Sequence, residues 1–233
     1  MAINLRMAEY GDFDVERVVE IAHAIRPDDY ESVATLNDWH DVQRRARRVC
    51  VRWLASLDGQ IVGSAYVGQS SWVPLTTMML YVAVHPDHQG RGIGRVLLEQ
   101  AEGTAGERGG SRTFSWTEEN WPRPMRFLTR AGYEVVERRW ESTLDLRRCD
   151  LNDLRAAVEQ SASSGVRILS IAALAAERSD WKHDLHRLYT AVEQDVPAPF
   201  PIQEVPFGDF EVLSLGRRLV RDGFFVALDG DEL

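Results

Sequence analysis

Cysteine is scarce in this chain, which has only two among its 233 residues. Cys50 and Cys149 lie in different segments, and neither belongs to a group with the spacing of metal ligands. Two isolated cysteines argue against both a disulfide framework and a zinc site. We therefore expect both to be small packing residues, and we expect no metal cofactor.

Long hydrophobic runs are also absent. No stretch of about 18 uncharged apolar residues occurs, which is the length that a membrane-spanning helix requires. The first residues lack the basic and apolar regions of a secretory signal peptide. These absences predict a cytoplasmic protein that has no membrane partner.

Positive charge is in deficit, because 27 lysines and arginines face 36 aspartates and glutamates, for a net charge of −9. A general nucleic-acid binder needs a basic face to neutralise phosphates, so nucleic acid is not an expected partner. The acidic balance weakly favours a cationic substrate, such as an amine.

Hydrophobic residues make up 44% of the chain, which suffices for one large domain or two modest ones. Asp58-Gly59 separates two apolar runs and predicts a two-residue hairpin turn. Apolar periodicity predicts the remaining elements of the first 146 residues. They are strands at 4–7, 50–57, 60–67, 78–84, 113–117 and 133–146, and helices at 14–25, 30–48, from 93 onward and from 122 to about 131.

A glycine-rich turn follows the strand at 78–84 and contains Gly90, Gly92 and Gly94. Glycines that free successive backbone N–H groups at the start of a helix suit a phosphorylated ligand. A Walker loop would need Lys and Ser or Thr after its last glycine, and the dinucleotide fingerprint would need a glycine at Arg95. Both patterns are excluded, and a tight corner without a ligand is the remaining alternative.

The spacing Gln89-x-x-Gly92-x-Gly94 resembles the signature of the Gcn5-related N-acetyltransferases (GNAT), which bind acetyl-coenzyme A (acetyl-CoA). The preceding Val84-His85-Pro86 and the order of predicted elements over residues 3–146 are similar to that family as well. The resemblance implies an α/β fold with a mixed sheet, the acyl-CoA N-acyltransferase (GNAT) fold. In that fold the strands before and after the glycine helix splay apart and admit the pantetheine arm.

The resemblance also assigns site residues. It implies that the strand backbone at Val82, Ala83 and Val84 borders the pantetheine arm, that a strand N–H polarises the thioester, and that Asn120 bonds the arm or an ordered water. The pyrophosphate would lie on the loop, whose residues are Gln89, Gly90, Arg91, Gly92, Ile93, Gly94 and Arg95. Nearby cations that could meet coenzyme A phosphates are His88, Arg91, Arg95, Arg123, Arg126 and Arg130, with solvated helix faces as the alternative.

The chain departs from the family at two catalytic positions. Met78 stands where many members have a glutamate base, and Leu128 stands where many have a tyrosine acid. Glu118 and Glu119 follow the strand at 113–117 and are the candidate catalytic residues, although loop carboxylates are often only solvated. Tyr66 and Trp72 are candidates for the acceptor side or for hairpin packing, and Tyr133 is a predicted core residue.

The last third of the chain looks like the opening of the same domain again. A strand at 166–169, helices and a strand at 224–228 precede Asp229-Gly230, and Leu228-Asp229-Gly230 repeats Leu57-Asp58-Gly59. We expect a GNAT domain over 1–149, a connector over 150–165 and a partial second repeat over 166–233 without a cofactor loop. We expect this unfinished sheet to complete the sheet of the first domain, to pair with another chain in a homodimer, or to be the remnant of a longer protein; an unrelated helical appendage is the alternative.

These observations predict an N-acetyltransferase that moves an acetyl group from acetyl-CoA directly to a primary amine of a small molecule or peptide. The alternative is a non-catalytic CoA-binding regulatory or scaffold module, which the residues at Met78 and Leu128 favour. His183 and His186 stand three apart on a predicted helix, and an exposed or interface pair is the stronger interpretation there than a metal site.

Overall fold

The computed structural model describes residues 3–28, 31–140, 142–145, 147, 155, 158–161, 165–217, 219–230 and 233. The chain forms two compact units. The first unit comprises Met1–Glu134 together with Phe200–Leu213, and the second comprises Val135–Pro199 together with Ser214–Leu233.

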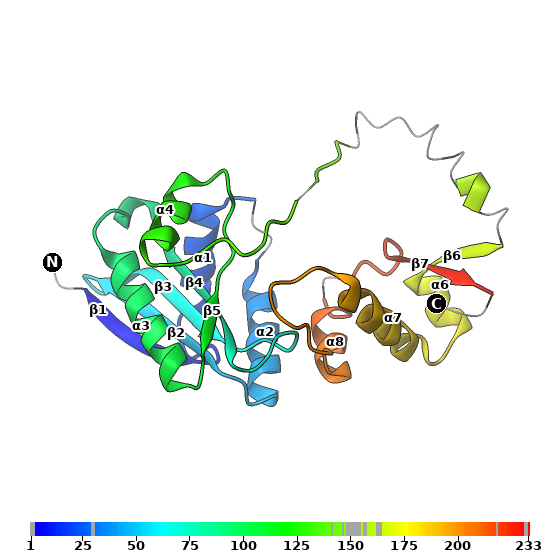
Figure 1. Ribbon diagram of the computed structural model, residues 1–233, viewed down its shortest axis with the longest axis horizontal. Helices are drawn as coiled ribbons and strands as arrows, with labels where there is room; N and C mark the ends of the chain where they lie inside the picture. The colour runs from blue at the N-terminus through cyan, green and yellow to red at the C-terminus, as the bar shows by residue number, and fades with distance from the viewer. Residues whose placement is uncertain are drawn as a thin grey trace. The chain divides into compact units, whose positions relative to one another are not determined.

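The first unit contains a five-stranded sheet (Figure 1). Its strands lie in chain order, from β1 to β5, and each of the first four is antiparallel to its neighbour. The last strand is parallel to β4, which makes the sheet mixed as predicted. The bounds are β1 Asn4–Glu9, β2 Cys50–Leu57, β3 Gln60–Gly68, β4 Thr77–Val84 and β5 Arg112–Phe114.

The predicted hairpin is confirmed, since Asp58 and Gly59 join β2 to β3 with φ of +49° and +82°. Two positive φ angles give the turn a twist that matches the twist of the strands it joins. Asp tolerates this conformation and Gly adopts it without strain.

Helices cover both faces of the sheet. Helix α3 (Ile93–Glu107) packs Ile93, Leu97 and Ala101 into the main core, and Trp53 of β2 donates a hydrogen bond to Thr104 of this helix (2.9 Å). On the opposite face, α1 (Val15–Ile25) and α2 (Val33–Arg45) bury a second cluster around Leu54. A short 3-10 helix, η1 (Pro86–His88), precedes α3, and α4 (Pro122–Arg130) follows β5.

Helix α2 is shorter than the predicted 30–48. Ser32 caps its first turn, because the Ser32 hydroxyl accepts a hydrogen bond from the Thr35 amide (3.2 Å) and the Thr35 hydroxyl accepts one from the Ser32 amide (2.9 Å). At the other end Arg47 has φ +52°, a left-handed conformation that terminates a helix. Local conformation at Ser32 and Arg47 therefore sets both ends of α2 inside the predicted range of 30–48.

The predicted strand at 133–146 is wrong for the described residues 133–140 and 142–145, which contain no strand. Tyr133 still contacts β5, since its hydroxyl lies 3.0 Å from the Thr113 hydroxyl. Beyond Tyr133 the described residues of this segment pair with no strand, and Val136 (68%) and Trp140 (91%) are exposed. Alternating apolar residues signal a strand only where a neighbouring strand can cover one face.

The segment Phe200–Leu213 lies far along the sequence but packs in the first unit. Phe200 contacts the rings of Trp72 and Phe114, and the Gln203 amide donates to the Trp72 carbonyl (2.9 Å). Helix α8 (Phe207–Leu213) carries Asp209, which pairs with Arg48 (2.5 Å). This segment therefore packs against Trp72, which precedes β4, and against Phe114, the last residue of β5.

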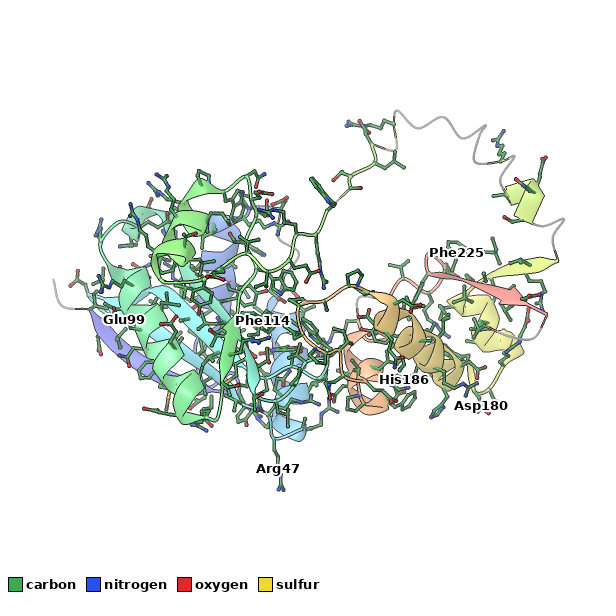
Figure 2. The ribbon with its side chains drawn as sticks, viewed as in Figure 1. Arg47, Glu99, Phe114, Asp180, His186 and Phe225 are labelled. Atoms are coloured by element: carbon green, nitrogen blue, oxygen red, sulfur yellow. The ribbon has the colours of Figure 1, made fainter. Side chains whose placement is uncertain are left out.

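The second unit contains two antiparallel strands, β6 (Val166–Ser170) and β7 (Phe225–Asp229), close to the strands predicted there. Helices α6 (Ile171–Glu177) and α7 (Trp181–Asp195) lie between them in the chain. Ile168 and Phe225 remain exposed on the strands (Phe225 is labelled in Figure 2). Most of the predicted connector at 150–165, and Cys149, lie outside the described residues. Among the described helices, none combines the length and apolar character that a membrane crossing needs.

Candidate active site

The C-terminal half of β4 has a free edge. Strand β5 pairs with β4 only from Thr77 to Met79, whereas β3 pairs with β4 as far as Val84. In the described sheet, Leu80–Val84 therefore has a strand partner on one side only. We call the backbone of these five residues the open edge of β4. It ends directly at the glycine-rich loop.

The direction of the backbone groups follows from one side-chain contact. Gln89 donates a hydrogen bond from Nε2 to the Val84 carbonyl (2.9 Å), so this carbonyl points away from β3. In an antiparallel pair, alternate residues point both main-chain groups outward. Val82 therefore also presents its N–H and C=O groups along the open edge, whereas the Leu80 N–H is used in the pairing of Met79 with Phe114 of β5, and the main-chain groups of Ala83 face Ser64 of β3.

The loop after β4 depends on two glycines in left-handed conformations. Gly90 has φ +77° and Gly92 has φ +82°, and Gly92 occupies the N-cap of α3. A Cβ atom at either position would meet nothing within 4 Å. The requirement for glycine is therefore conformational and not steric. Gly94 has no positive φ, and a Cβ there would make ordinary contacts of 3.7 Å with Phe127.

These conformations leave backbone donors exposed at the start of α3. In the described chain, no carbonyl accepts from the amides between Gly90 and Gly94, whereas the Arg95 amide donates to the Gly92 carbonyl (3.1 Å). Successive free N–H groups at a helix N-terminus form an anion site, and the helix dipole adds to it. The loop therefore fits a pyrophosphate. Among the predicted loop residues, Arg95 contributes least, because its amide already donates to the Gly92 carbonyl.

Gln89 connects the strand, the loop and α4. While its Nε2 atom donates to Val84, its Oε1 atom accepts a hydrogen bond from Arg123 of α4 (2.8 Å). The spacing Gln89-x-x-Gly92-x-Gly94 identified Gln89 as a signature residue. It did not predict that Gln89 bridges Val84 and Arg123. The bridge also confirms that Arg123 lies beside the loop.

The other predicted cations differ in their availability. Arg91 donates to the Asp87 carbonyl (3.1 Å) and Arg126 to the Pro122 carbonyl (3.1 Å), which are local contacts that an anion could replace. Arg95 pairs with Glu99 on the outward face of α3 (2.8 Å; Glu99 is labelled in Figure 2). His88 lies in η1, and the centroid of its ring is 5.9 Å from the centroid of the His85 ring.

The predicted catalytic carboxylates lie in the turn between α4 and β5, the strand that ends at Phe114 (labelled in Figure 2). The Glu118 carboxylate lies 3.3 Å from the guanidinium of Arg26, the residue that caps α1, so an ion pair joins this turn to α1. Glu119 and Asn120 are exposed in the same turn. Met78 is fully buried against α3, and Leu128 of α4 is half-buried; neither side chain can transfer a proton.

A row of side chains crosses the sheet face opposite α3. Arg52, Tyr66 and Tyr81 lie directly opposite one another on β2, β3 and β4. Tyr81 is next to the open edge and 37% exposed, and burial raises its pKa to about 12. Tyr66 is buried and accepts a hydrogen bond from Trp39 (3.3 Å), whereas Trp72 packs in an aromatic cluster. Tyr81 was missed by sequence analysis. The alternation of residues along the strand at 78–84 would have placed it on the face opposite the buried residues 78, 80 and 84.

Two further groups bear on the chemistry. Burial raises the pKa of the Cys50 thiol to about 11, so this thiol is protonated at neutral pH and is a poor nucleophile. His183 and His186 lie on α7 of the second unit, and no group of three or more metal-ligating side chains occurs within the described residues.

Comparison with known proteins agrees with this geometry. The model of the acetyltransferase (GNAT) family matches residues 15–133. No curated protein matches the chain. Similar solved structures include yncA, a putative acetyltransferase from Salmonella typhimurium with its cofactor acetyl-CoA; it is 20% identical with a TM-score of 0.47, and the match covers 57% of this chain and 79% of that one.

Another similar structure is a GCN5-related N-acetyltransferase from Ralstonia eutropha JMP134, which is 18% identical with a TM-score of 0.47. That match covers 61% of this chain and 99% of the Ralstonia protein. The aminoglycoside N-acetyltransferase AAC(6')-Iy in complex with CoA is 17% identical with a TM-score of 0.48, over 64% of this chain and 96% of its own length. Because the family model spans just over half of the chain, including β2 to α4, the chain belongs to the acetyltransferase (GNAT) family, a family of acetyl-CoA-dependent enzymes.

Proposed function

We propose that this protein transfers the acetyl group of acetyl-CoA directly to a primary amine. One observation carries the proposal: the open edge of β4 runs without interruption into a loop whose amides are free. An extended chain bearing amide groups fits the first feature, and a pyrophosphate fits the second. Pantetheine joined to a pyrophosphate has both parts in this order.

We assign a role to each predicted cofactor residue except Arg95, whose amide donates to the Gly92 carbonyl. Val82 and Val84 supply outward main-chain groups for the pantetheine arm, and Ala83 holds them in register through β3. The amides of Gly90, Arg91, Gly92, Ile93 and Gly94 bind the pyrophosphate, and Gln89 keeps the end of the strand against Arg123. Asn120 bonds the arm from the turn after β5.

The reaction needs two proton movements besides binding. The acceptor nitrogen attacks the thioester carbonyl carbon, the carbon–sulfur bond breaks, the nitrogen loses a proton and the thiolate gains one. A free N–H on the open edge polarises the carbonyl. Glu118 or Glu119 takes the proton from the amine, directly or through water, because these are the carboxylates of the turn that follows β5.

The carboxylates are tested with Glu118→Gln and Glu119→Gln, with Glu99→Gln on the far face of α3 as the matched control. Thiol release in the presence of an amine panel measures turnover, and calorimetry measures acetyl-CoA affinity. We expect one of the two turn variants to lose turnover at least tenfold with unchanged affinity, as removal of a general base predicts. Full turnover in both single variants and in the double variant would remove these residues from the mechanism.

A non-catalytic CoA-binding module is the second candidate, and the burial of Met78 favours it. A fully buried methionine occupies the strand position at which many family members are expected to have a glutamate. Such a module would bind acetyl-CoA in calorimetry and release no thiol with any amine. An enzyme would do both, so the same pair of assays separates the candidates.

We also propose that the second unit is a partial GNAT repeat. Its two strands are antiparallel and enclose helices in the chain, as β1 and β2 enclose α1 and α2. Gly230 after β7 has φ +61°, and Gly59 after β2 has φ +82°. The exposure of two large apolar side chains, Val136 and Trp140, in the segment after Tyr133 favours a homodimer. Light scattering of the full chain tests this: a monomer at all concentrations would contradict it.

A further inference from the structure

A positively charged side chain on the sheet lacks an ion-pair partner. Arg52 of β2 is partly buried, and within the described residues no carboxylate oxygen lies within 4 Å of its guanidinium. Its Nη1 atom donates to the Ser64 hydroxyl at 3.3 Å, and its Nε atom is buried without an acceptor. An orphaned donor on a charged group is costly, so its retention needs a reason.

Aromatic rings hold this guanidinium in place. Its Cζ atom lies 5.4 Å from the Phe13 ring centroid and 5.3 Å from the Tyr66 ring centroid, both within the range of cation–π attraction. Tyr66 is itself fixed by the hydrogen bond from Trp39. A planar cation held by rings, with a free N–H, is preorganised for a carboxylate or phosphate.

Neighbouring ionisable groups do not neutralise Arg52. Burial lowers the pKa of Arg52, and Tyr66, Cys50 and Glu31 oppose that shift. Of these, only Glu31 carries a carboxyl group, and it accepts a hydrogen bond from Thr35. Burial, with the fields of Arg52 and Arg44, lowers the pKa of His40 to about 4, so this residue adds no positive charge at neutral pH.

The position of Arg52 relates it to the open edge of β4. Arg52, Tyr66 and Tyr81 face each other across three adjacent strands, and Tyr81 borders the open edge. Adjacent strands are about 4.8 Å apart, so the Arg52 and Tyr81 backbones are separated by about 10 Å. An acceptor whose amine reaches the open edge can extend a second group along this row to Arg52.

We infer that Arg52 binds an oxyanion of the acceptor, so that the substrate is an amine carrying a carboxylate or phosphate at the far end of a short chain. The inference rests on the proposed acetyl transfer for the place of the amine. The anion accepts from Nη2, which has no hydrogen-bond partner within the described residues and, unlike Nε, is not fully buried, and the aliphatic chain lies along Tyr81. Arg52 is a specificity residue and takes no part in proton transfer.

The test uses the full chain and three sets of probes of graded length: ω-amino carboxylates, ω-aminoalkyl phosphates and the simple alkylamines of the same length. Thiol release gives kcat/KM for each probe. Wild-type protein should prefer one anionic set over the alkylamines by about 10- to 100-fold, the range of a hydrogen bond to a charged group. The preferred set identifies the oxyanion.

Arg52→Met is the test variant, since it keeps the bulk of the side chain and removes the charge. In this variant the ratio of kcat/KM for the anionic probe to that for the alkylamine should fall to about 1. Its acetyl-CoA affinity should be unchanged, and its melting temperature should equal or exceed that of wild type. Arg6→Met removes the same charge from the neighbouring strand β1 and should retain the preference. A wild type without preference, or an Arg52→Met variant that keeps it, overturns the inference; a variant that melts earlier and keeps its preference assigns Arg52 to stability.

A binding readout separates this inference from the proposed function. The melting temperature of the CoA-bound protein is measured with each probe, which needs no turnover. If the anionic probe stabilises wild type and not Arg52→Met, the oxyanion site stands even where no thiol is released, and only the proposed transfer fails. If neither anionic set stabilises wild type more than the alkylamines do, the oxyanion site is overturned.

Discussion

Replacing Gly92 by alanine should weaken acetyl-CoA binding while leaving the fold intact. At φ +82° an alanine costs about 1–2 kcal/mol relative to its relaxed conformation. The surroundings do not enforce this angle, because Gly92 is exposed and a Cβ would meet nothing within 4 Å. The loop therefore relaxes, its amides turn away from the pyrophosphate site, and binding must restore the strained angle.

The expected magnitude follows from that strain. If binding must restore a strain of about 1–2 kcal/mol, Kd rises by about 5- to 30-fold. Calorimetric titration with acetyl-CoA measures it. S-acetylpantetheine, which lacks the pyrophosphate, should bind Gly92→Ala as it binds wild type.

Gly94→Ala is the matched control two residues along the same loop. Gly94 has no positive φ, and a Cβ there makes ordinary van der Waals contact with Phe127 and Val84. Its acetyl-CoA affinity should stay within about twofold of wild type, and as a glycine in the first turn of α3 it should not lose stability. The reasoning is refuted if Gly92→Ala is folded and binds as wild type does, or if Gly94→Ala loses as much affinity.

Three further outcomes concern stability. Gly103→Ala, at an exposed interior position of α3 with open space around the new Cβ, should raise the free energy of unfolding by about 0.5–1 kcal/mol in urea titration; a loss would mean that the helix is distorted there. Asp209→Asn should lower it by up to about 3 kcal/mol and expose residues 200–213 to proteolysis, because the side chains of Arg48 and Asp209 are only 11% and 14% exposed. Glu99→Gln breaks an exposed pair and should cost under about 0.5 kcal/mol; equal losses in the two variants would contradict the argument from burial. His40, with its pKa lowered from 6.5 to about 4, binds fewer protons folded than unfolded, so stability should fall as pH falls from about 6.5 to 4, by up to about 3 kcal/mol; the slope in this window should flatten in His40→Gln, and an unchanged slope would assign the effect to other groups.

Local chemistry made much of the fold predictable from sequence. Asp58-Gly59 specifies its hairpin almost alone, and the observed strands at 50–57 and 60–68 match the predicted runs within one residue. The glycine spacing placed the start of α3 at Ile93. These features depend on neighbours in the chain, so a sequence pattern contains the information.

The features that escaped prediction depend on partners distant in sequence. The alternation after Tyr133 is a genuine strand pattern, but whether it becomes a strand depends on a neighbour that the described chain does not provide. Nothing local marks Phe200 as a partner of Trp72 and Phe114. At the site, the bridge from Gln89 to Arg123 and the alignment of Arg52 with Tyr81 arise only when separate strands and helices meet.

The two faces of β4 differ in how completely their polar groups are satisfied. On the α3 face, Leu80 and Met78 pack against an apolar core, and the polar contact between Trp53 and Thr104 is complete. On the other face, Arg52 retains an orphaned donor and His40 a buried ring nitrogen without a partner. Folding alone favours satisfying such groups or replacing them with apolar ones. Two such groups on the side beside the open edge are expected where a fold gives up local stability to bind a ligand, and under the proposed transfer they favour this face as the side on which the acceptor enters.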